Sequence, residues 1–263
     1  MILAFFRKAQ HLSLDIVFGA VILLRFFSQE LSVSPSWAAY FLLAASIWLI
    51  YTVDHLRDAR KAVQSSRARY QFHLRHEKIL KRIILLITVI SSILAVYVNQ
   101  AILFGGIVLV ALSGVYLLIH QFLSSIGLKE LYVAMVYTIG ILLVPFIIAE
   151  TVRWDMMMLL FLLTYANLII FSWFEKEEDK ADNFNSIATQ LNDSRLEVVI
   201  FCILSLGLAL SFQMSLSRLS VYFFSGFAIY AVICINRKWS RVDLRYRAIG
   251  DGVFLIPILF EWI

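Results

Sequence analysis

Residues 50–61 read IYTVDHLRDARK, and in this stretch a strongly apolar run ends in two carboxylates, Asp54 and Asp58. Residues four apart share one face of a helix, so these two side chains are predicted to be neighbours. Residues 174–183 read FEKEEDKADN and close another apolar run, with Glu175 and Asp179 at the same spacing. We therefore expect a fold that brings these two acidic helix ends together.

The composition places both stretches in a membrane protein. Of the 263 residues, 61% are hydrophobic and 16% are charged, whereas a soluble domain is about half apolar and about a quarter charged. With 10 glycines and 3 prolines the chain has little loop material. We expect an all-α polytopic membrane protein with a single domain over residues 1–263. The net charge of +5 is attributed to membrane topology, and no nucleic-acid partner is expected.

Nine segments are candidates for crossing the lipid bilayer, because a spanning helix needs about 20 consecutive apolar residues. The ninth candidate is short. The nine segments are residues 12–30, 36–56, 79–98, 101–122, 130–149, 155–175, 196–214, 218–236 and 248–263.

Lys and Arg fall almost entirely in alternate loops, and this indicates the orientation of the chain. The loops on the opposite side carry only Arg153 and Arg218. The pattern predicts a cytoplasmic N-terminus, an external C-terminus and both acidic stretches on the cytoplasmic side. We expect residues 57–78 and 176–195 to form cap loops there. The short loops and the lack of a targeting sequence indicate a bacterial inner membrane.

Four carboxylates at one membrane face are hard oxygen ligands, and Mg²⁺ is commonly held by one or two carboxylates together with phosphate oxygens. Basic side chains flank the acidic ones, and the apolar helices offer room for a hydrocarbon tail. The pattern therefore suggests a lipid diphosphate as substrate, with Mg²⁺ at the four carboxylates. The alternative is an ordinary solvated surface, in which Asp54 pairs with Arg57 or Asp58 pairs with Lys61.

Nine helices with acidic motifs at the cytoplasmic ends of the second and sixth resemble the UbiA superfamily of intramembrane prenyltransferases. The resemblance covers the whole chain. The usual first motif of that superfamily is Asn-Asp-x-x-Asp-x-x-x-Asp. Its last two aspartates fall on Asp54 and Asp58, while its opening pair becomes Ile50 and Tyr51. One carboxylate and one amide of the usual metal shell are therefore missing.

The usual second motif, Asp-x-x-x-Asp-x-x-x-Gly, falls on Glu175, Asp179 and Asn183. Glu175 is one methylene longer than the usual aspartate, and Asn183 is tolerable if its position needs a left-handed backbone. The superfamily's lysine at the start of the fifth helix, which contacts the diphosphate, matches Lys129. Further diphosphate contacts are expected from side chains near the motifs: Arg57, Lys61, Lys180 and Asn183.

The resemblance implies a helical bundle with a cytoplasm-facing cavity. In that cavity Mg²⁺ and Lys129 would stabilise the diphosphate leaving group as an allylic C–O bond breaks. Aromatic faces would stabilise the allylic cation. Three residues near the motifs either line this hydrophobic cavity or pack between helices: Tyr51, Asn167 and Phe171.

Three functions are compatible with these residues. The first is a Mg²⁺-dependent prenyltransferase that moves an isoprenoid chain from its diphosphate to an aromatic or other lipophilic acceptor. The second is a membrane terpene cyclase of the same superfamily, in which the cation closes on its own double bonds. The third is a non-catalytic membrane protein or a transporter with the same fold, although few polar residues lie deep in the predicted spans.

Overall fold

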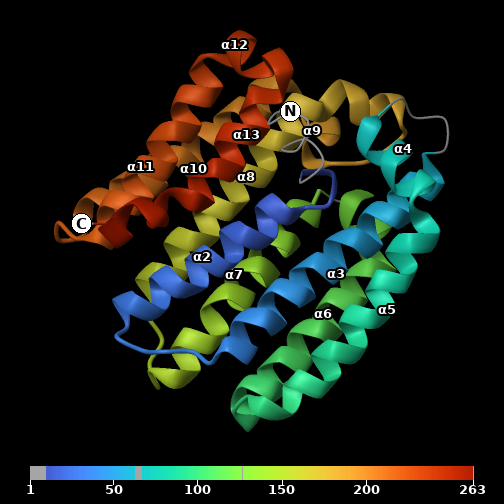
Figure 1. Cartoon of the computed structure of the whole chain (residues 1–263). Helices are drawn as coiled ribbons and strands as arrows, with labels where there is room; N and C mark the ends of the chain where they lie inside the picture. The colour runs from blue at the N-terminus through green and yellow to red at the C-terminus, as the bar shows by residue number, and fades with distance from the viewer. Residues whose placement is uncertain (1–9, 63–66, 126, 263) are drawn as a thin grey trace.

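A computed structural model describes residues 10–62, 67–125 and 127–262, and every element in these ranges is helical (Figure 1). The long helices lie side by side as a bundle, and short helices gather at one end of it. We call this end, which carries α4, α9 and α12, the basic end. The helices are α2 (Leu14–Glu30), α3 (Trp37–Lys61), α4 (Ala68–Arg75), α5 (Glu77–Leu94), α6 (Gln100–Ser125), α7 (Lys129–Ile148), α8 (Trp154–Ala181), α9 (Ile187–Gln190), α10 (Asp193–Gln213), α11 (Arg218–Ile235), α12 (Arg237–Arg241) and α13 (Arg245–Gly252).

Seven helices among the described residues are long and apolar enough to cross a membrane: α3, α5 with the 3₁₀ turn η1 (Ala95–Tyr97), α6, α7, α8, α10 and α11. They coincide with seven of the nine predicted segments, so the all-α membrane bundle is confirmed. The first predicted segment is the 17-residue helix α2. The last predicted segment is α13 followed by the 3₁₀ helix η3 (Val253–Trp262). Pro257 lies inside η3 and has no backbone N–H, so it cannot donate the hydrogen bond that an α-helix needs there. The count of nine spans stays a prediction.

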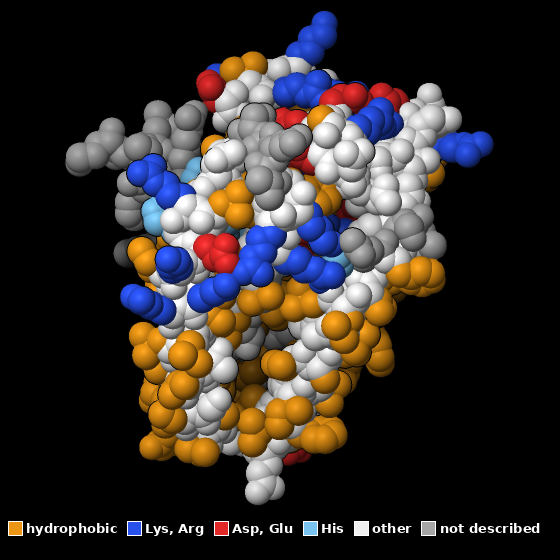
Figure 2. Space-filling model, turned by 90° about the vertical axis from the view of Figure 1, so that its right-hand side faces the viewer, with side chains coloured by type: hydrophobic (Ala, Val, Ile, Leu, Met, Phe, Trp, Pro, Cys, Tyr) orange, Lys and Arg blue, Asp and Glu red, His pale blue; other side chains and the backbone are white. Residues whose placement is uncertain are grey.

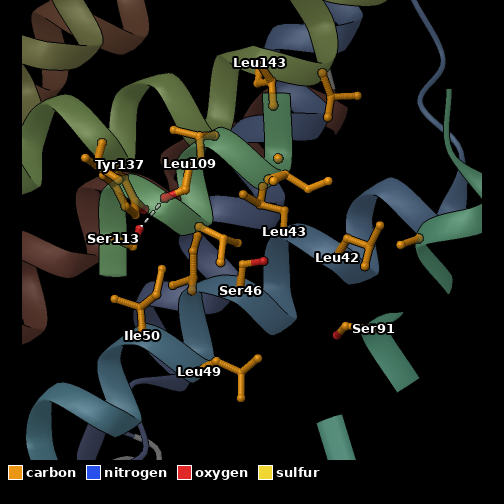
Figure 3. A pocket seen from close by; sticks show the side chains of 18 of the residues that line it. Leu42, Leu43, Ser46, Leu49, Ile50, Ser91, Leu109, Ser113, Tyr137 and Leu143 are labelled. Atoms are coloured by element: carbon orange, nitrogen blue, oxygen red, sulfur yellow. Dashed lines mark hydrogen bonds between the residues drawn. The ribbon is translucent and has the colours of Figure 1, made fainter. Parts of the chain in front are cut away.

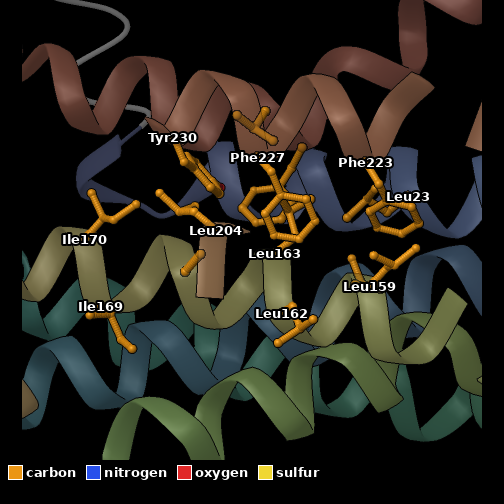
Figure 4. Packing of buried hydrophobic residues seen from close by; sticks show 14 of the residues in the cluster. Leu23, Leu159, Leu162, Leu163, Ile169, Ile170, Leu204, Phe223, Phe227 and Tyr230 are labelled. Atoms are coloured by element: carbon orange, nitrogen blue, oxygen red, sulfur yellow. The ribbon is translucent and has the colours of Figure 1, made fainter. Parts of the chain in front are cut away.

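Helix α8 lies at the centre of the bundle, and most of its length is buried. It packs against α7, α10 and α11. In Figure 4, Phe223 and Phe227 of α11 point towards the α8 side chains Leu159 and Leu163. By contrast, α5 and α6 expose large apolar side chains along their length. A continuous exposed apolar surface of this kind is typical of helices that face lipid.

Gly207 of α10 is a point where the core has no room for a larger residue. A Cβ at Gly207 would overlap the ring of Phe227 on α11. Overpacking of this kind costs roughly 1–3 kcal/mol, so we expect Gly207→Ala to lower the thermal unfolding midpoint of the purified protein. Gly114→Ala on α6 is the matched control, because a Cβ at Gly114 meets nothing within 4 Å. Equal midpoints for the two variants would contradict this packing.

Both acidic motifs lie on helices that extend beyond the apolar runs. Helix α3 continues to Lys61 and α8 continues to Ala181. The predicted cap loops 57–78 and 176–195 therefore begin inside helices, and they contain the short helices α4 and α9. Residues 63–66 of the first loop lie outside the described ranges. The extension keeps both pairs of carboxylates on regular helix, where the four-residue spacing fixes their common face.

The end of α8 confirms that Asn183 takes a left-handed backbone conformation. Its φ is 55°, in a region that asparagine adopts more readily than most residues. The N–H of Phe184 donates to the carbonyl of Asp179 at 2.8 Å, which closes the last turn of the helix. This helix end holds Asp179 in a fixed position on α8.

Candidate active site

Two adjoining cavities lie within the bundle. The first, which we call the polar chamber, has a volume of about 220 Å³ and lies at the basic end. Charged side chains from α2, α3, α7, α8 and α13 line it. Both acidic motifs are part of the lining, which thus includes Asp54, Asp58, Glu175 and Asp179.

The first motif presents unsatisfied oxygen to the chamber. Oδ1 of Asp54 is buried and makes no hydrogen bond to the described residues, and Asp58, one turn further along α3, is buried as well. Lys129, the first residue of α7, lines the same chamber and attracts both carboxylates electrostatically. Two carboxylates and an ammonium group at one point can hold a metal cation and a phosphate anion together.

The second motif is already paired with arginines of this chain. Glu175 accepts a hydrogen bond from the hydroxyl of Tyr246 (3.1 Å) and forms an ion pair with Arg247, both on α13. Asp179 accepts a hydrogen bond from Arg67 at 2.8 Å. These pairs could not be predicted from the sequence, because both arginines look like the other basic residues of the alternate loops.

Arg67 joins the segment after α3 to the end of α8. Besides Asp179, its guanidinium lies 2.8 Å from Asp182, 3.6 Å from Glu178 and 3.9 Å from Glu175. Burial lowers the pKa of Arg67, but the hydrogen bond to Asp179 and the neighbouring charges outweigh this effect and raise the pKa above its ordinary value. Arg67 therefore stays charged and holds the start of α4 against the end of α8; we call Arg67 and α4 the cap.

We expect Arg67→Gln to release this cap. The change removes the charge at the centre of a half-buried ion-pair network and takes away the arginine that donates to Asp179. Trypsin cleavage after Lys61 and Arg69, mapped by mass spectrometry, should become about tenfold faster, because local opening costs less free energy. Arg75→Gln on the exposed surface of α4 is the control. Unchanged cleavage of Arg67→Gln would show that the network does not hold the cap.

The chamber has the chemistry for one divalent cation at the first motif. The described residues contain no group of three or more His, Cys, Asp or Glu side chains placed to hold a metal ion. Asp54 and Asp58 nevertheless offer hard oxygen ligands, and Mg²⁺ often takes one or two carboxylates and completes its shell with phosphate oxygens. Because Arg67 and Arg247 engage the second motif, its carboxylates are less available to a metal ion.

The second cavity, which we call the apolar groove, has a volume of about 470 Å³ and lies between α3, α5, α6 and α7. Figure 3 shows Leu43, Ile50, Leu109 and Leu143 around it. The combined site therefore has a charged end and a long apolar end, as a molecule with a diphosphate head and a hydrocarbon tail requires. The residues that line both cavities are Tyr51, Asp54, Tyr116, Val133 and Tyr137.

The structure places Tyr51, Asn167 and Phe171 in the lining of the polar chamber. Asn167 also donates a hydrogen bond to the hydroxyl of Tyr230 at 3.0 Å. Phe171 lies under the guanidinium of Arg247, 5.4 Å from ring centre to charge. Asn167 and Phe171 thus hold helices together as well as facing the chamber, while Tyr51 lies where the two cavities meet.

Arg57 and Lys61 connect α3 to α6 instead of reaching into the chamber. Arg57 donates a hydrogen bond to the backbone carbonyl of Leu117, and Nζ of Lys61 lies 3.4 Å from Nε2 of His120. These contacts join α3 to α6 at the basic end, and neither residue lines the groove. Four residues that were predicted to contact the diphosphate do not line the chamber: Arg57, Lys61, Lys180 and Asn183.

Glu130 is a buried member of the site that sequence reasoning missed. Its Oε1 accepts hydrogen bonds from the hydroxyl of Ser172 (3.3 Å) and from the N–H of Ile187 (3.2 Å). It thereby links α7, α8 and α9 next to Lys129. The one sign of this role in the sequence was that Glu130 directly follows Lys129 at the start of a predicted span.

Comparison with known families gives one match. A model of the UbiA prenyltransferase family matches residues 73–256, which is more than half of the chain. A comparison with curated proteins found no match, and a comparison with solved structures found none either.

Proposed function

Because the chain belongs to the UbiA prenyltransferase family, we propose that it is a Mg²⁺-dependent intramembrane transferase that ionises an isoprenoid diphosphate. The prenyl chain would pass to an aromatic or other lipophilic acceptor. The observation that carries this proposal is the junction of a charged chamber with an apolar groove at Tyr51 and Asp54. The basic end would face the cytoplasm, as the distribution of Lys and Arg predicts.

Asp54 and Asp58 would hold Mg²⁺, which acts as a Lewis acid on the diphosphate when it is bound. Lys129 binds the leaving diphosphate by its ammonium group and stabilises the charge that develops on it. The allylic C–O bond breaks, and its electron pair stays on the diphosphate oxygen. The acceptor then attacks the allylic carbon and loses a proton.

Three tyrosines surround the point where the allylic carbon would lie. Tyr51, Tyr116 and Tyr137 line both cavities, so they lie between the expected positions of the diphosphate and the tail. Their ring faces can stabilise a cation by the attraction of a positive charge to the aromatic quadrupole.

Release of inorganic diphosphate tests the proposal. Purified protein would receive geranyl, farnesyl or geranylgeranyl diphosphate with Mg²⁺ or with a chelator, and with or without a membrane lipid extract as a source of acceptor. We expect release that needs both Mg²⁺ and the extract, together with a product heavier than the acceptor by one prenyl group. Release without extract, with a cyclic hydrocarbon product, would favour a terpene cyclase. The proposal would be contradicted if none of the three diphosphates bound to the protein and none of them released inorganic diphosphate.

A further inference from the structure

Two carboxyl groups outside both acidic motifs meet in the polar chamber. Asp15 comes from the first turn of α2 and Asp251 from α13, two helices that pack against each other. Both residues line the chamber, and their carboxyl groups are hydrogen-bonded to each other. Oδ1 of Asp15 is buried and receives no other hydrogen bond from the described residues. The proposed chemistry at Asp54, Asp58 and Lys129 does not use this pair.

The pair shares one proton and carries one negative charge. Two carboxylates in contact repel each other so strongly that both cannot ionise. Asp15 lies at a helix N-terminus, where backbone N–H groups stabilise a negative charge, whereas Asp251 lies inside the continuous helical stretch 245–262. The shared proton is therefore on Asp251, which donates it to Asp15. Arg247 attracts both carboxyl groups, but it already forms an ion pair with Glu175.

A band of Lys and Arg lies on another side of the bundle from the pair. Figure 2 looks at the side that carries α5 and α6, and it shows this band above hydrophobic side chains. Helix α3 packs on both α2 and α5, and α7 packs on both α2 and α6. Lys129 of α7 attracts Asp54 and Asp58. An anionic group of a ligand is therefore drawn towards the motifs and not towards the pair.

Two hydroxyl groups of the chamber lack a partner as well. The hydroxyl of Tyr137 on α7 and Oγ1 of Thr164 on α8 make no hydrogen bond to the described residues, and both residues line the chamber. Thr164 is only 5% exposed. Tyr137 lies close enough to Asp251 and Asp15 to interact with them electrostatically. A buried hydroxyl group without a partner is unfavourable, and a polar group of a ligand would satisfy it.

Thr164 and Asp251 lie at a similar depth in the bundle. A Cβ at Gly226 of α11 would lie 2.9 Å from Leu163 of α8 and 3.0 Å from Val253. Leu163 directly precedes Thr164, and Val253 comes two residues after Asp251. The unpaired hydroxyl groups and the carboxyl pair thus belong to one part of the chamber.

We propose that Asp15 and Asp251 bind the hydroxyl group of the acceptor and take the proton that the acceptor loses. This inference rests on the proposed function, because it concerns the acceptor of the same transfer. The acceptor hydroxyl donates to Asp15, and its oxygen accepts a hydrogen bond from Tyr137 or Thr164. Because the pair is negatively charged, the acceptor is an uncharged hydroxyl compound and not a carboxylate.

The pair lies next to the expected position of the allylic carbon. Tyr51 and Tyr137 line both cavities, and both interact electrostatically with the pair. The O–H bond of the acceptor breaks and its proton passes to Asp15. The electron pair of that bond forms the new bond to the allylic carbon, from the oxygen or through a conjugated ring. Both carboxyl groups are then neutral, and the pair returns to its first state by releasing one proton to water.

Binding of two matched probes tests the chemistry of this part of the chamber. Para-butylphenol is uncharged at neutral pH, and para-butylbenzoate is a carboxylate of nearly the same size. The protein would be held in lipid nanodiscs with Mg²⁺ and unreactive geranylgeranyl thiodiphosphate, and empty nanodiscs would correct for partition into lipid. We expect the phenol to bind about tenfold or more tightly than the benzoate.

The two unpaired hydroxyl groups allow a variant with a matched control. Tyr137→Phe combined with Thr164→Val keeps the side-chain volumes, and we expect it to bind para-butylphenol about tenfold more weakly. Tyr222→Phe combined with Thr138→Val is the control. Both control residues are buried and their hydroxyl groups also lack a partner among the described residues, but they line neither cavity. Equal binding by the two double variants would overturn the inference.

Prenyl transfer to acceptors in the membrane lipid extract tests the removal of the proton. Asp15→Asn and Asp251→Asn each keep one carboxylate, so we expect each to lower transfer by about tenfold. The double variant keeps none and should lower transfer by about a thousandfold or more, which exceeds the product of the two single losses. Binding of geranylgeranyl thiodiphosphate should be unchanged in all three variants.

Two further results would overturn the inference. One is a double variant whose loss is no greater than the product of the single losses, and the other is equal affinity of the wild type for the phenol and the benzoate. A wild type that neither binds geranylgeranyl thiodiphosphate nor transfers a prenyl group from the matching diphosphate would instead contradict the proposed function.

Discussion

The Asp54→Asn variant is expected to lose diphosphate release by about three orders of magnitude or more, because it removes charge from a side chain that we propose as a ligand of the Mg²⁺ ion. The replacement keeps the volume of the side chain, and Oδ1 of Asp54 has no hydrogen-bond partner among the described residues, so the fold should be unaffected. The measurement is diphosphate release at saturating Mg²⁺, alongside the thermal unfolding midpoint in detergent.

Glu177→Gln is the control for this result. Glu177 belongs to the second acidic stretch, but it is exposed and pairs with Lys180 at 3.1 Å, and it does not line the chamber. Its variant should keep nearly full activity. If Asp54→Asn retained activity within a few-fold of the wild type, the first motif would not hold a catalytic metal ion. If Asp54→Asn lowered the thermal unfolding midpoint but kept normal activity per folded molecule, the conclusion would be the same.

The second large effect is expected from Arg247→Met, and it concerns stability. Arg247 lines the chamber on α13 and pairs with buried Glu175 of α8. Removing one partner of a buried pair costs roughly 3–5 kcal/mol, and without Arg247 only the hydroxyl of Tyr246 and the more distant Arg67 compensate the charge of Glu175. For a chain of this size we expect the thermal unfolding midpoint to fall by about 10 °C.

Two further variants separate this mechanism from a general loss of packing. Arg247→Met combined with Glu175→Met removes both charges, so it should recover a large part of the lost stability. Arg245→Met, on the same helix, removes an arginine that stacks on Trp239 outside the chamber, and it should cost about 1 kcal/mol or less. A double variant no more stable than Arg247→Met would show that the pair is not the source of the effect.

The helical scaffold was predictable because the thickness of a bilayer fixes the length of an apolar run. Seven predicted segments match long helices, and the extension of α3 to Lys61 and of α8 to Ala181 was the main error in their ends. Lys, Arg and Glu are good helix formers, but the apolar run marks only the part of a helix that crosses the membrane, so the sequence is a weak guide to where such a helix stops.

The site was predictable in part, for a similar reason. The four carboxylates and Lys129 stand at helix ends with a regular spacing, and the structure places all five in one chamber. The arginine pairs were not predictable, because Arg67 lies 112 residues from Asp179 and Arg247 lies 72 residues from Glu175. Local spacing carries no information about pairs that only the packing of distant helices creates.

The exposed apolar surface of α5 and α6 has a consequence for kinetics. Arg57 and Lys61 join α3 to α6 at the basic end, whereas α5 and α6 form one side of the groove and expose apolar side chains where they would face lipid. A substrate that enters and leaves through that side diffuses in two dimensions within the membrane. The quantity that determines the rate is then the mole fraction of substrate among the lipids, and dilution with inert lipid should slow turnover even when the bulk concentration of substrate is constant.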